Sequence, residues 1–121
     1  MQSNWCGFYR RTSEHLLTVG PYQGSMGCLR TDFERGVCGA CARSGEIQLV
    51  PDVEHLRSSS GQDAHIACDD RTRSELVVPV IVRGELHAVL DLDSPHLAAF
   101  SQAEANRLLL LVRDAFLDAS F

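Results

Sequence analysis

Residues 74–93 have the sequence SELVVPVIVRGELHAVLDLD, and this stretch decides the fold. Two apolar runs, Ser74 to Val82 and Leu86 to Asp93, are joined by Arg83-Gly84-Glu85. Because valine and isoleucine favour extended backbone and glycine favours a turn, the sequence predicts a β-hairpin. Pro79 cannot donate a ladder hydrogen bond, so we expect an edge position or a bulge there.

Alternation along the second run of this hairpin predicts which side chains lie on each face of the strand. A period of two places four apolar side chains on one face, Leu86, Ala88, Leu90 and Leu92, and leaves the other face to His87, Val89, Asp91 and Asp93. A strand this apolar should be buried, yet Asp91 and Asp93 share a face, and Glu75 begins the neighbouring strand. Close carboxylates raise the pKa of at least one of them, and burial raises it further. We expect a pocket that holds a cation or a shared proton; the alternative is a face that meets water.

The first half of the chain predicts a second hairpin and a short helix. We expect a strand from Trp5 to Arg10, with Trp5, Gly7 and Tyr9 on one face, and a returning strand from His15 to Tyr22. Glycines punctuate an irregular stretch around Cys28. Further elements are expected in chain order: a helix at Val37–Arg43, a strand at Ile47–Val50 and a polar surface loop at Arg57–Asp63.

The end of the chain predicts a closing helix. Ser101-Gln102-Ala103-Glu104 has the pattern of a capping box. A core stripe follows at helical spacing: Leu108, Leu111, Val112, Ala115 and Phe116. Together these elements predict an α+β fold in one domain, residues 1–121, whose antiparallel sheet carries the closing helix on one face and a pocket on the other.

Composition excludes several classes of function. The net charge of −5 and the low aromatic content of 7% argue against a nucleic-acid surface. The longest apolar run, Leu108 to Val112, is far short of the ~20 residues of a membrane-spanning helix. The N-terminus has no basic segment followed by an apolar one, so we expect a cytoplasmic protein.

Five cysteines in a cytoplasmic chain point to thiol chemistry or metal binding rather than structural disulfides. Cys38 lies near a predicted helix start, where free amides favour a thiolate. Cys68 has arginines nearby that favour its thiolate and aspartates that oppose it. Cys28 lies between glycines, as a resolving thiol requires. The alternatives are burial as small hydrophobes, or a zinc site that Cys38 and Cys41 would form with His65 and Cys68.

Seven segments together resemble the free methionine-R-sulfoxide reductases, a catalytic branch of the GAF family. They occur in family order over nearly the whole chain: Asn4–Tyr9, Gly20–Gly24, Gly36–Gly39, Val50–Val53, His65–Asp69, Ser74–Pro79 and Val89–Ser94. The resemblance implies a GAF-like antiparallel sheet of about five to six strands flanked by helices around a small pocket. No cofactor and no metal is implied.

The resemblance also implies the reaction and its thiols. Free L-methionine-(R)-sulfoxide would be reduced to methionine, with Cys68 matching the thiol that attacks the sulfoxide sulfur. Cys28 matches the principal resolving thiol and Cys38 a further redox cysteine. The sulfenic acid on the attacking thiol would condense to a disulfide, and thioredoxin would be the reducing partner.

The remaining matches concern the substrate. Glu75, Asp91 and Asp93 match the pocket acids, one of which would protonate the sulfoxide oxygen while others hold the free ammonium group. Trp5 and Tyr9 match the aromatic wall. Two alternatives are a non-catalytic GAF domain that binds a small ligand as a sensor, and an inactive truncated relative.

Three departures from the family carry expectations of their own. The chain begins almost on the Trp5 strand, without the helices that normally precede it. We therefore expect a partly exposed apolar surface near Leu108 to Phe116, or cover from a partner such as a second copy. The loop from Glu54 to Ala64 is longer than usual. Cys6 and Cys41 replace residues that are usually not cysteine in the family, and Cys41 is a competing candidate for the resolving thiol.

Overall fold

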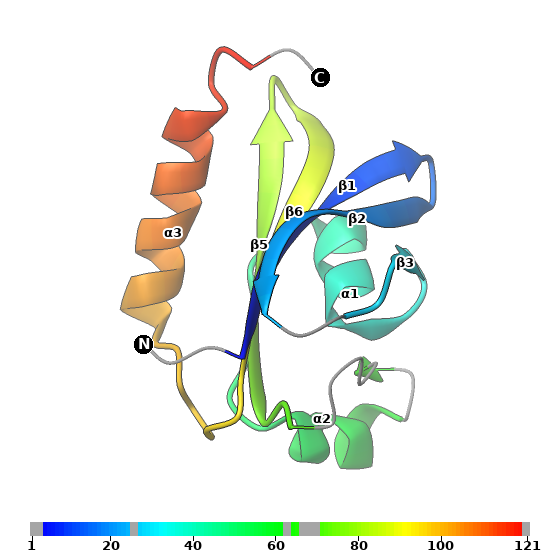
Figure 1. The fold of residues 1–121 in the computed structure, drawn as a ribbon, viewed down its shortest axis with the longest axis vertical. Coiled ribbons are helices and arrows are strands. Elements are labelled where there is room, and N and C mark those ends of the chain that lie inside the picture. Colours follow the sequence, from blue (N-terminus) through cyan, green and yellow to red (C-terminus); the bar gives the residue numbers. More distant parts are fainter. Residues whose placement is uncertain (1–3, 25–26, 62–63, 66–70, 120–121) are drawn as a thin grey trace.

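A six-stranded antiparallel sheet forms the centre of the molecule, as the computed structural model of residues 4–24, 27–61, 64–65 and 71–119 shows (Figure 1). The strand order is β3-β2-β1-β6-β5-β4. The strands are β1 (Trp5–Ser13), β2 (Leu16–Gly24), β3 (Arg30–Asp32), β4 (Gln48–Val50), β5 (Ser74–Val82) and β6 (Glu85–Ser94). The helices are α1 (Gly36–Ser44), α2 (Val53–Ser60) and α3 (Gln102–Ala115). The predicted α+β class is confirmed, and β3 is an additional strand within a stretch predicted to be irregular.

The predicted hairpin is β5 and β6, with a join one residue shorter than expected. Val82 pairs with Glu85, so Arg83 and Gly84 alone form the turn, with φ of 53° and 80°. Positive φ at both positions gives the turn whose twist matches that of the flanking strands. Strand β4 pairs with β5 only as far as Val77. Pro79 therefore lies beyond β4, on the edge part of β5, as predicted.

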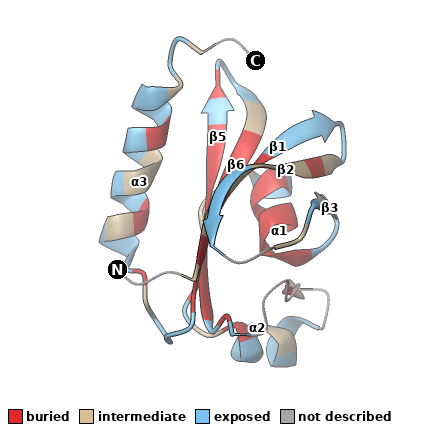
Figure 2. Cartoon of the chain, in the orientation of Figure 1, coloured by how far each residue is buried: buried red, intermediate tan, exposed pale blue. Residues whose placement is uncertain are grey.

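The hairpin separates two cores. Ala88, Leu90 and Leu92 pack in the core that contacts α3, whereas Val77 and Val89 pack in the core on the α1 side. Buried residues line the hairpin and the inner face of α1 (Figure 2). The predicted faces are thus confirmed for residues 88–93. Leu86 is an exception because pairing passes from Val80–Ala88 to Ile81–Leu86, which leaves out His87 and turns Leu86 to the α1 side.

The polar segment after β4 forms helix α2, which includes residues 57–60 of the surface loop predicted at Arg57–Asp63. Asp52 caps α2 by accepting hydrogen bonds from two first-turn amides, at 3.0 and 3.3 Å. Ser58 and Ser59 donate their hydroxyls to carbonyls one turn earlier, at 3.0 and 2.8 Å. The serines therefore bond within the helix, where the sequence alone favours a loop. The segment from Glu54 to Ala64, predicted to be a long loop, is helical as far as Ser60.

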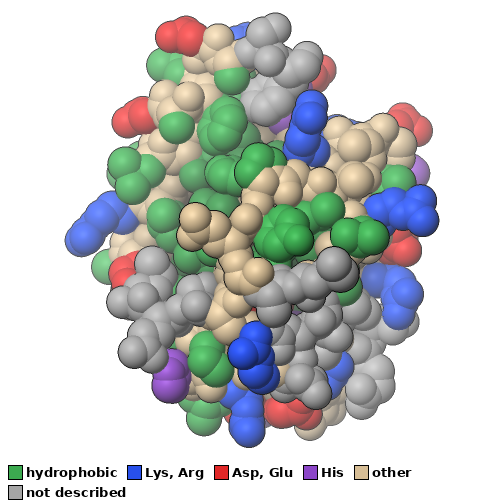
Figure 3. Space-filling model, viewed as in Figure 1, with side chains coloured by type: hydrophobic (Ala, Val, Ile, Leu, Met, Phe, Trp, Pro, Cys, Tyr) green, Lys and Arg blue, Asp and Glu red, His purple; other side chains and the backbone are tan. Residues whose placement is uncertain are grey.

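Helix α3 begins at the predicted capping box and covers the sheet face opposite α1 (Figure 1). Its core stripe differs from the prediction, because Leu111 and Ala115 are exposed. The side chains that face the sheet are Ala105, Leu108, Leu109, Val112 and Phe116. The expected exposed apolar surface is confirmed, since Leu110, Leu111 and Leu117 are 58%, 59% and 64% exposed. Hydrophobic side chains gather over this part of the molecule (Figure 3).

Within the described ranges, no helix is both long and apolar enough to cross a membrane.

Candidate functional site

Strand register brings the predicted pocket residues onto one face of the sheet. Asp93 pairs with Trp5 on one side and with Glu75 on the other. Asp91 pairs with Gly7, and Tyr9 follows two positions after Gly7 along β1. Paired residues of antiparallel strands point to the same side, as do residues two apart in one strand. Three adjacent strands therefore present two aromatic rings and three carboxyl groups toward α1.

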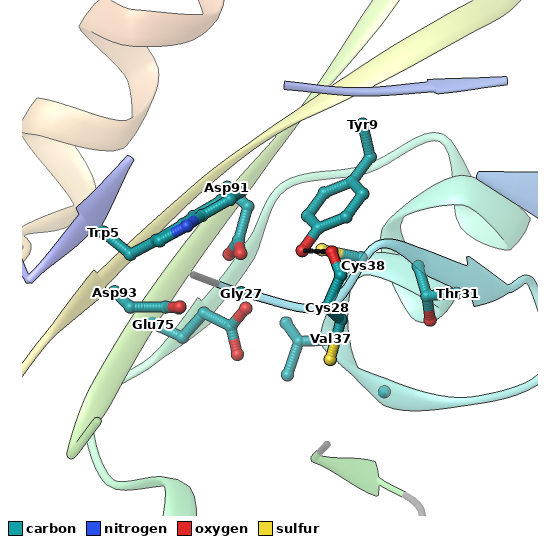
Figure 4. Close-up of a pocket in the computed structure, with 11 residues that line it drawn as sticks. Trp5, Tyr9, Gly27, Cys28, Thr31, Val37, Cys38, Glu75, Asp91 and Asp93 are labelled. Carbon is teal, nitrogen blue, oxygen red and sulfur yellow. Dashed lines mark hydrogen bonds between the residues drawn. The ribbon is translucent and has the colours of Figure 1, made fainter. Parts of the chain in front are cut away.

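These side chains line a pocket that is partly open to solvent (Figure 4). Seven of the eight predicted site residues line it, and Cys68 lies outside the described residues. The full lining is Trp5, Tyr9, Gly27, Cys28, Thr31, Gly36, Val37, Cys38, Glu75, Asp91 and Asp93.

The aromatic wall is built around Trp5. Its ring stacks with Tyr9 and with Tyr22, with centroid distances of 5.4 and 5.6 Å. Gly7 makes this packing possible, because a Cβ at that position would lie 2.4 Å from the Tyr22 Cβ and 2.6 Å from the Trp5 ring. The Tyr9 hydroxyl donates to the Cys28 carbonyl at 3.0 Å (Figure 4). The ring thus ties the Cys28 segment to the sheet.

The carboxyl groups form a buried cluster. Glu75 is 6% and Asp91 4% exposed, so the alternative of a face that meets water is wrong. Burial raises the pKa of Glu75 well above its usual range, and Asp93 raises it further. Burial likewise raises the pKa of Asp91, with a second contribution from Glu75. The cluster therefore holds protons more readily than exposed carboxyl groups do.

Cys38 lies next to this cluster, at the third residue of α1. It is buried, and its sulfur lies within 4.8 Å of carboxyl oxygens of Asp91 and Glu75. Burial raises the pKa of the Cys38 thiol well above its usual range, and Asp91 and Glu75 add to the effect. The thiolate expected from the helix start is therefore wrong, because desolvation and two nearby carboxyls outweigh the helix amides.

The other cysteines differ in chemical state. Cys28 is disulfide-bonded in the structure, whereas Cys6, Cys38 and Cys41 are free thiols. Cys6 packs against the α3-side core. Cys41 is completely buried in the α1-side core, and burial, with Asp91, raises the pKa of its thiol to about 12. Its proposed competition as a resolving thiol stays a prediction.

One buried contact was not predicted from the sequence. His65, 3% exposed, places its Nε2 3.3 Å from Glu75 Oε1. The sequence singles out His65 only as the first residue of the run His65–Asp69 and as a possible zinc ligand. Nothing in the spacing indicates Glu75 as its partner.

Three of the lining side chains are placed so that they could hold a metal ion. The ligand atoms of Cys38, Glu75 and Asp91 lie within 4.8 Å of one another. A thiol with two carboxylates suits Zn²⁺. This set differs from the zinc site considered from the sequence, since neither Cys41 nor His65 belongs to it.

Proteins of similar sequence are known from bacteria and yeast. The chain is 37% identical over 109 residues to the free methionine-R-sulfoxide reductase of Escherichia coli, with 90% of this chain and 62% of the relative aligned. The enzyme of that name from Saccharomyces cerevisiae is 38% identical, over 91% and 59%. The chain therefore spans about three fifths of the length of these curated relatives.

The fold agrees with solved structures. The free methionine-R-sulfoxide reductase of Neisseria meningitidis, in complex with its substrate, superposes with a TM-score of 0.81 at 39% identity, covering 92% of this chain and 64% of that one. A GAF domain family model matches residues 1–115. The chain therefore belongs to the GAF domain family.

Proposed function

We propose that this domain reduces free L-methionine-(R)-sulfoxide to L-methionine. The observation that carries the proposal is the cavity in which two cysteines, three carboxyl groups and two aromatic rings converge from distant parts of the chain. The names of similar proteins from bacteria and yeast support it. Such a site offers thiol groups, a proton source and a packing surface, which together suit the reduction of a sulfoxide.

The proposed first step transfers oxygen from the substrate to the enzyme. The Cys68 thiolate attacks the sulfoxide sulfur while a carboxylic acid of the cluster protonates the sulfoxide oxygen. The S–O bond of the substrate breaks, methionine leaves, and Cys68 becomes a sulfenic acid. A sulfoxide is a poor electrophile until its oxygen is protonated. A carboxylic acid whose pKa is raised by burial therefore suits the role of general acid.

The rest of the pocket would recognise a free amino acid. An ionised carboxylate in a dry site needs a cation, and the substrate ammonium supplies one. A residue within a peptide has no ammonium at that position, which explains a preference for the free form. The Trp5 ring offers a surface for the S-methyl group. Its stacking with Tyr9 and Tyr22 restricts the ring, so the ring can favour one sulfoxide epimer.

The proposed second step forms a disulfide. The Cys28 thiol condenses with the Cys68 sulfenic acid, and water is released. Two findings support this pairing: Cys28 is disulfide-bonded, and the other described cysteines are free thiols. Thioredoxin, a cytoplasmic dithiol, then returns both sulfurs to thiols and itself becomes oxidised. Cys38 would be a further redox cysteine, protonated at rest because it is buried beside Asp91.

Single turnover of the reduced protein tests these roles. Cys68→Ser should form no methionine, because no thiol is left to attack. Cys28→Ser should form about one equivalent and then stop or slow greatly, because the sulfenic acid lacks its partner. Cys6→Ser is the matched control, since Cys6 packs on the α3 side of the sheet, away from the cavity.

Two outcomes would count against the proposal. Loss of the first methionine equivalent in both Cys68→Ser and Cys28→Ser would contradict the division of roles. Folded, reduced wild-type protein that binds the sulfoxide without any turnover, with thioredoxin, thioredoxin reductase and NADPH present, would favour a sensor domain.

A further inference from the structure

Cys38, Glu75 and Asp91 bring one sulfur and two carboxyl groups to one part of the pocket. The ligand atoms that they offer lie within 4.8 Å of one another, although the residues come from α1, β5 and β6. All three side chains are buried, with exposed fractions of 8%, 6% and 4%. The group is therefore a feature of the interior that three separate elements hold in place.

Asp91 leaves one carboxyl oxygen, Oδ1, without a hydrogen-bond partner among the described residues, although this oxygen is buried. Figure 4 shows the carboxyl group pointing into the pocket, toward those of Glu75 and Asp93. A buried carboxylate oxygen that meets neither a donor nor a cation costs free energy. The pocket wall offers no cation, since none of the described residues that line it is basic. A positively charged ligand from outside therefore suits this position.

The donor atoms and their spacing favour Zn²⁺ as that ligand. Zn²⁺ binds cysteine sulfur at about 2.3 Å and carboxylate oxygen at about 2.0–2.2 Å, which places two ligands of a tetrahedral ion about 3.5 Å apart. The ligand atoms already lie within 4.8 Å of one another, and rotation of the Glu75 side chain can supply the remaining approach. A thiolate ligand selects Zn²⁺ over Mg²⁺ and Ca²⁺, which prefer oxygen ligands.

His65 supports one of these ligands from outside the sheet. It is 3% exposed, and its Nε2 lies 3.3 Å from Glu75 Oε1. Arg57 Nε donates to the His65 carbonyl at 3.4 Å, which attaches this residue to α2. Carboxylates that bind metal ions in proteins are themselves held by such outer contacts, which orient them. Glu75 is therefore held in the way that a metal ligand requires.

We propose that the protein binds one Zn²⁺ ion through Cys38 Sγ and the carboxylates of Glu75 and Asp91, with the fourth position open to the pocket. The ion replaces the thiol proton, which passes to solvent. Asp93 pairs with Glu75 in the sheet and adds negative charge beside the ion without being a ligand. The ion occupies carboxyl groups that the substrate ammonium would need, so the two compete; this consequence alone rests on the proposed function.

Cobalt(II) is the probe for the sulfur ligand, because a Co–thiolate bond gives a charge-transfer absorption band. The whole chain, reduced and freed of metal with a chelator, should bind one equivalent of Co²⁺ with this band, and one equivalent of Zn²⁺ should remove the band. The variant Cys28→Ser/Cys68→Ser should keep the band, because Cys38 is then the remaining thiol among the described lining residues. Cys38→Ser should lose it.

Zn²⁺ affinity, measured by competition with a chromogenic chelator, tests the carboxylates. Asp91→Asn and Glu75→Gln should each lower it by roughly a hundredfold or more, because losing a ligand costs more than losing an outer contact. His65→Leu should lower it by about 10–100-fold, the usual cost of losing an outer contact. Cys6→Ser and Asp114→Asn are the matched controls, a thiol on the α3 side of the sheet and an exposed carboxyl group of α3, and should bind as wild type does.

Three results would overturn the metal site. They are an unchanged band in folded Cys38→Ser, loss of the band in Cys28→Ser/Cys68→Ser, and wild-type Zn²⁺ affinity in both carboxyl variants. Should Cys38→Ser fail to fold, the double variant and the carboxyl variants decide the question, because they leave Cys38 in place.

Competition separates the metal site from the proposed function. Free methionine-R-sulfoxide, added to Cys28→Ser/Cys68→Ser so that no turnover occurs, should lower the apparent Zn²⁺ affinity. An N-acetylated sulfoxide, which lacks the ammonium group, should have little effect. Zn²⁺ that binds equally well with and without the sulfoxide would uphold the metal site and reject only the placement of the ammonium group on these carboxylates.

Discussion

Asp91 links the stability of the fold to the chemistry of the pocket. It is 4% exposed, and burial together with Glu75 raises its pKa. The folded protein therefore keeps a proton that the unfolded chain releases above its ordinary pKa of about 3.9. The stabilising contribution is complete below that pH and is lost as the pH rises through the folded-state pKa. Holding a proton in the buried cluster thus costs stability as the pH rises.

Asp91→Asn tests this cost. Asparagine does not ionise, so the stability of Asp91→Asn relative to wild type should increase from about pH 5 to about pH 8. The lowered pKa of His65 acts in the opposite direction, since its contribution is lost as the pH falls toward 4, but it is present in both proteins and largely cancels. Urea denaturation at both pH values gives the difference. Asp114→Asn, at an exposed site of α3, is the control. A difference that stays constant with pH would contradict the prediction.

Most side chains of the cavity were predictable because strand alternation decides their direction. A period of two puts Trp5 with Tyr9 and Asp91 with Asp93, and antiparallel pairing then joins the two strands. The His65–Glu75 contact was not predictable. It depends on where a polar segment packs in three dimensions, and such a segment has no hydrophobic period that could indicate its position. The protonated state of Cys38 was missed for a similar reason, since burial at the helix start is a tertiary property.

The sequence predicts helix α3 correctly but predicts the wrong residues for part of its buried face. The capping box fixed where the helix begins, but four consecutive leucines, residues 108–111, allow more than one stripe. Val112 is common to the predicted and observed stripes, whereas Leu111 differs. The angle at which α3 crosses the sheet chooses between them, and the helix sequence does not contain that angle.

Paired alanine substitutions in α3 measure the two faces. Val112→Ala should lower the free energy of unfolding by roughly 1–3 kcal/mol, because it removes methyl groups from a filled core. Leu111→Ala should change it by about 0.5 kcal/mol or less, because Leu111 is 59% exposed. Chemical denaturation of both variants supplies the values. If Leu111→Ala cost as much as Val112→Ala, Leu111 would be covered in solution.

For the molecule as a whole, ligand binding should stabilise the folded state. Free methionine-R-sulfoxide at about 100 times its Kd should add roughly 2.7 kcal/mol, because it binds only the folded chain. The Cys68→Ser variant prevents turnover during a thermal melt. An N-acetylated sulfoxide, which lacks the ammonium group, should give little or no rise in Tm. Equal stabilisation by both compounds would show that the carboxyl cluster does not bind the ammonium group.

The two faces of β6 also limit how this sequence can change over generations. From Ala88 to Asp93, every second residue packs in the α3-side core, and the residues between face the α1 side, where Asp91 and Asp93 line the cavity. A deletion or insertion of one residue there would exchange the two sets, directing leucines into the cavity and aspartates beneath α3. The irregular pairing at His87 separates this part from the hairpin tip. We therefore expect insertions and deletions to be tolerated at the hairpin tip, whereas one within residues 88–93 would disrupt both faces of the strand.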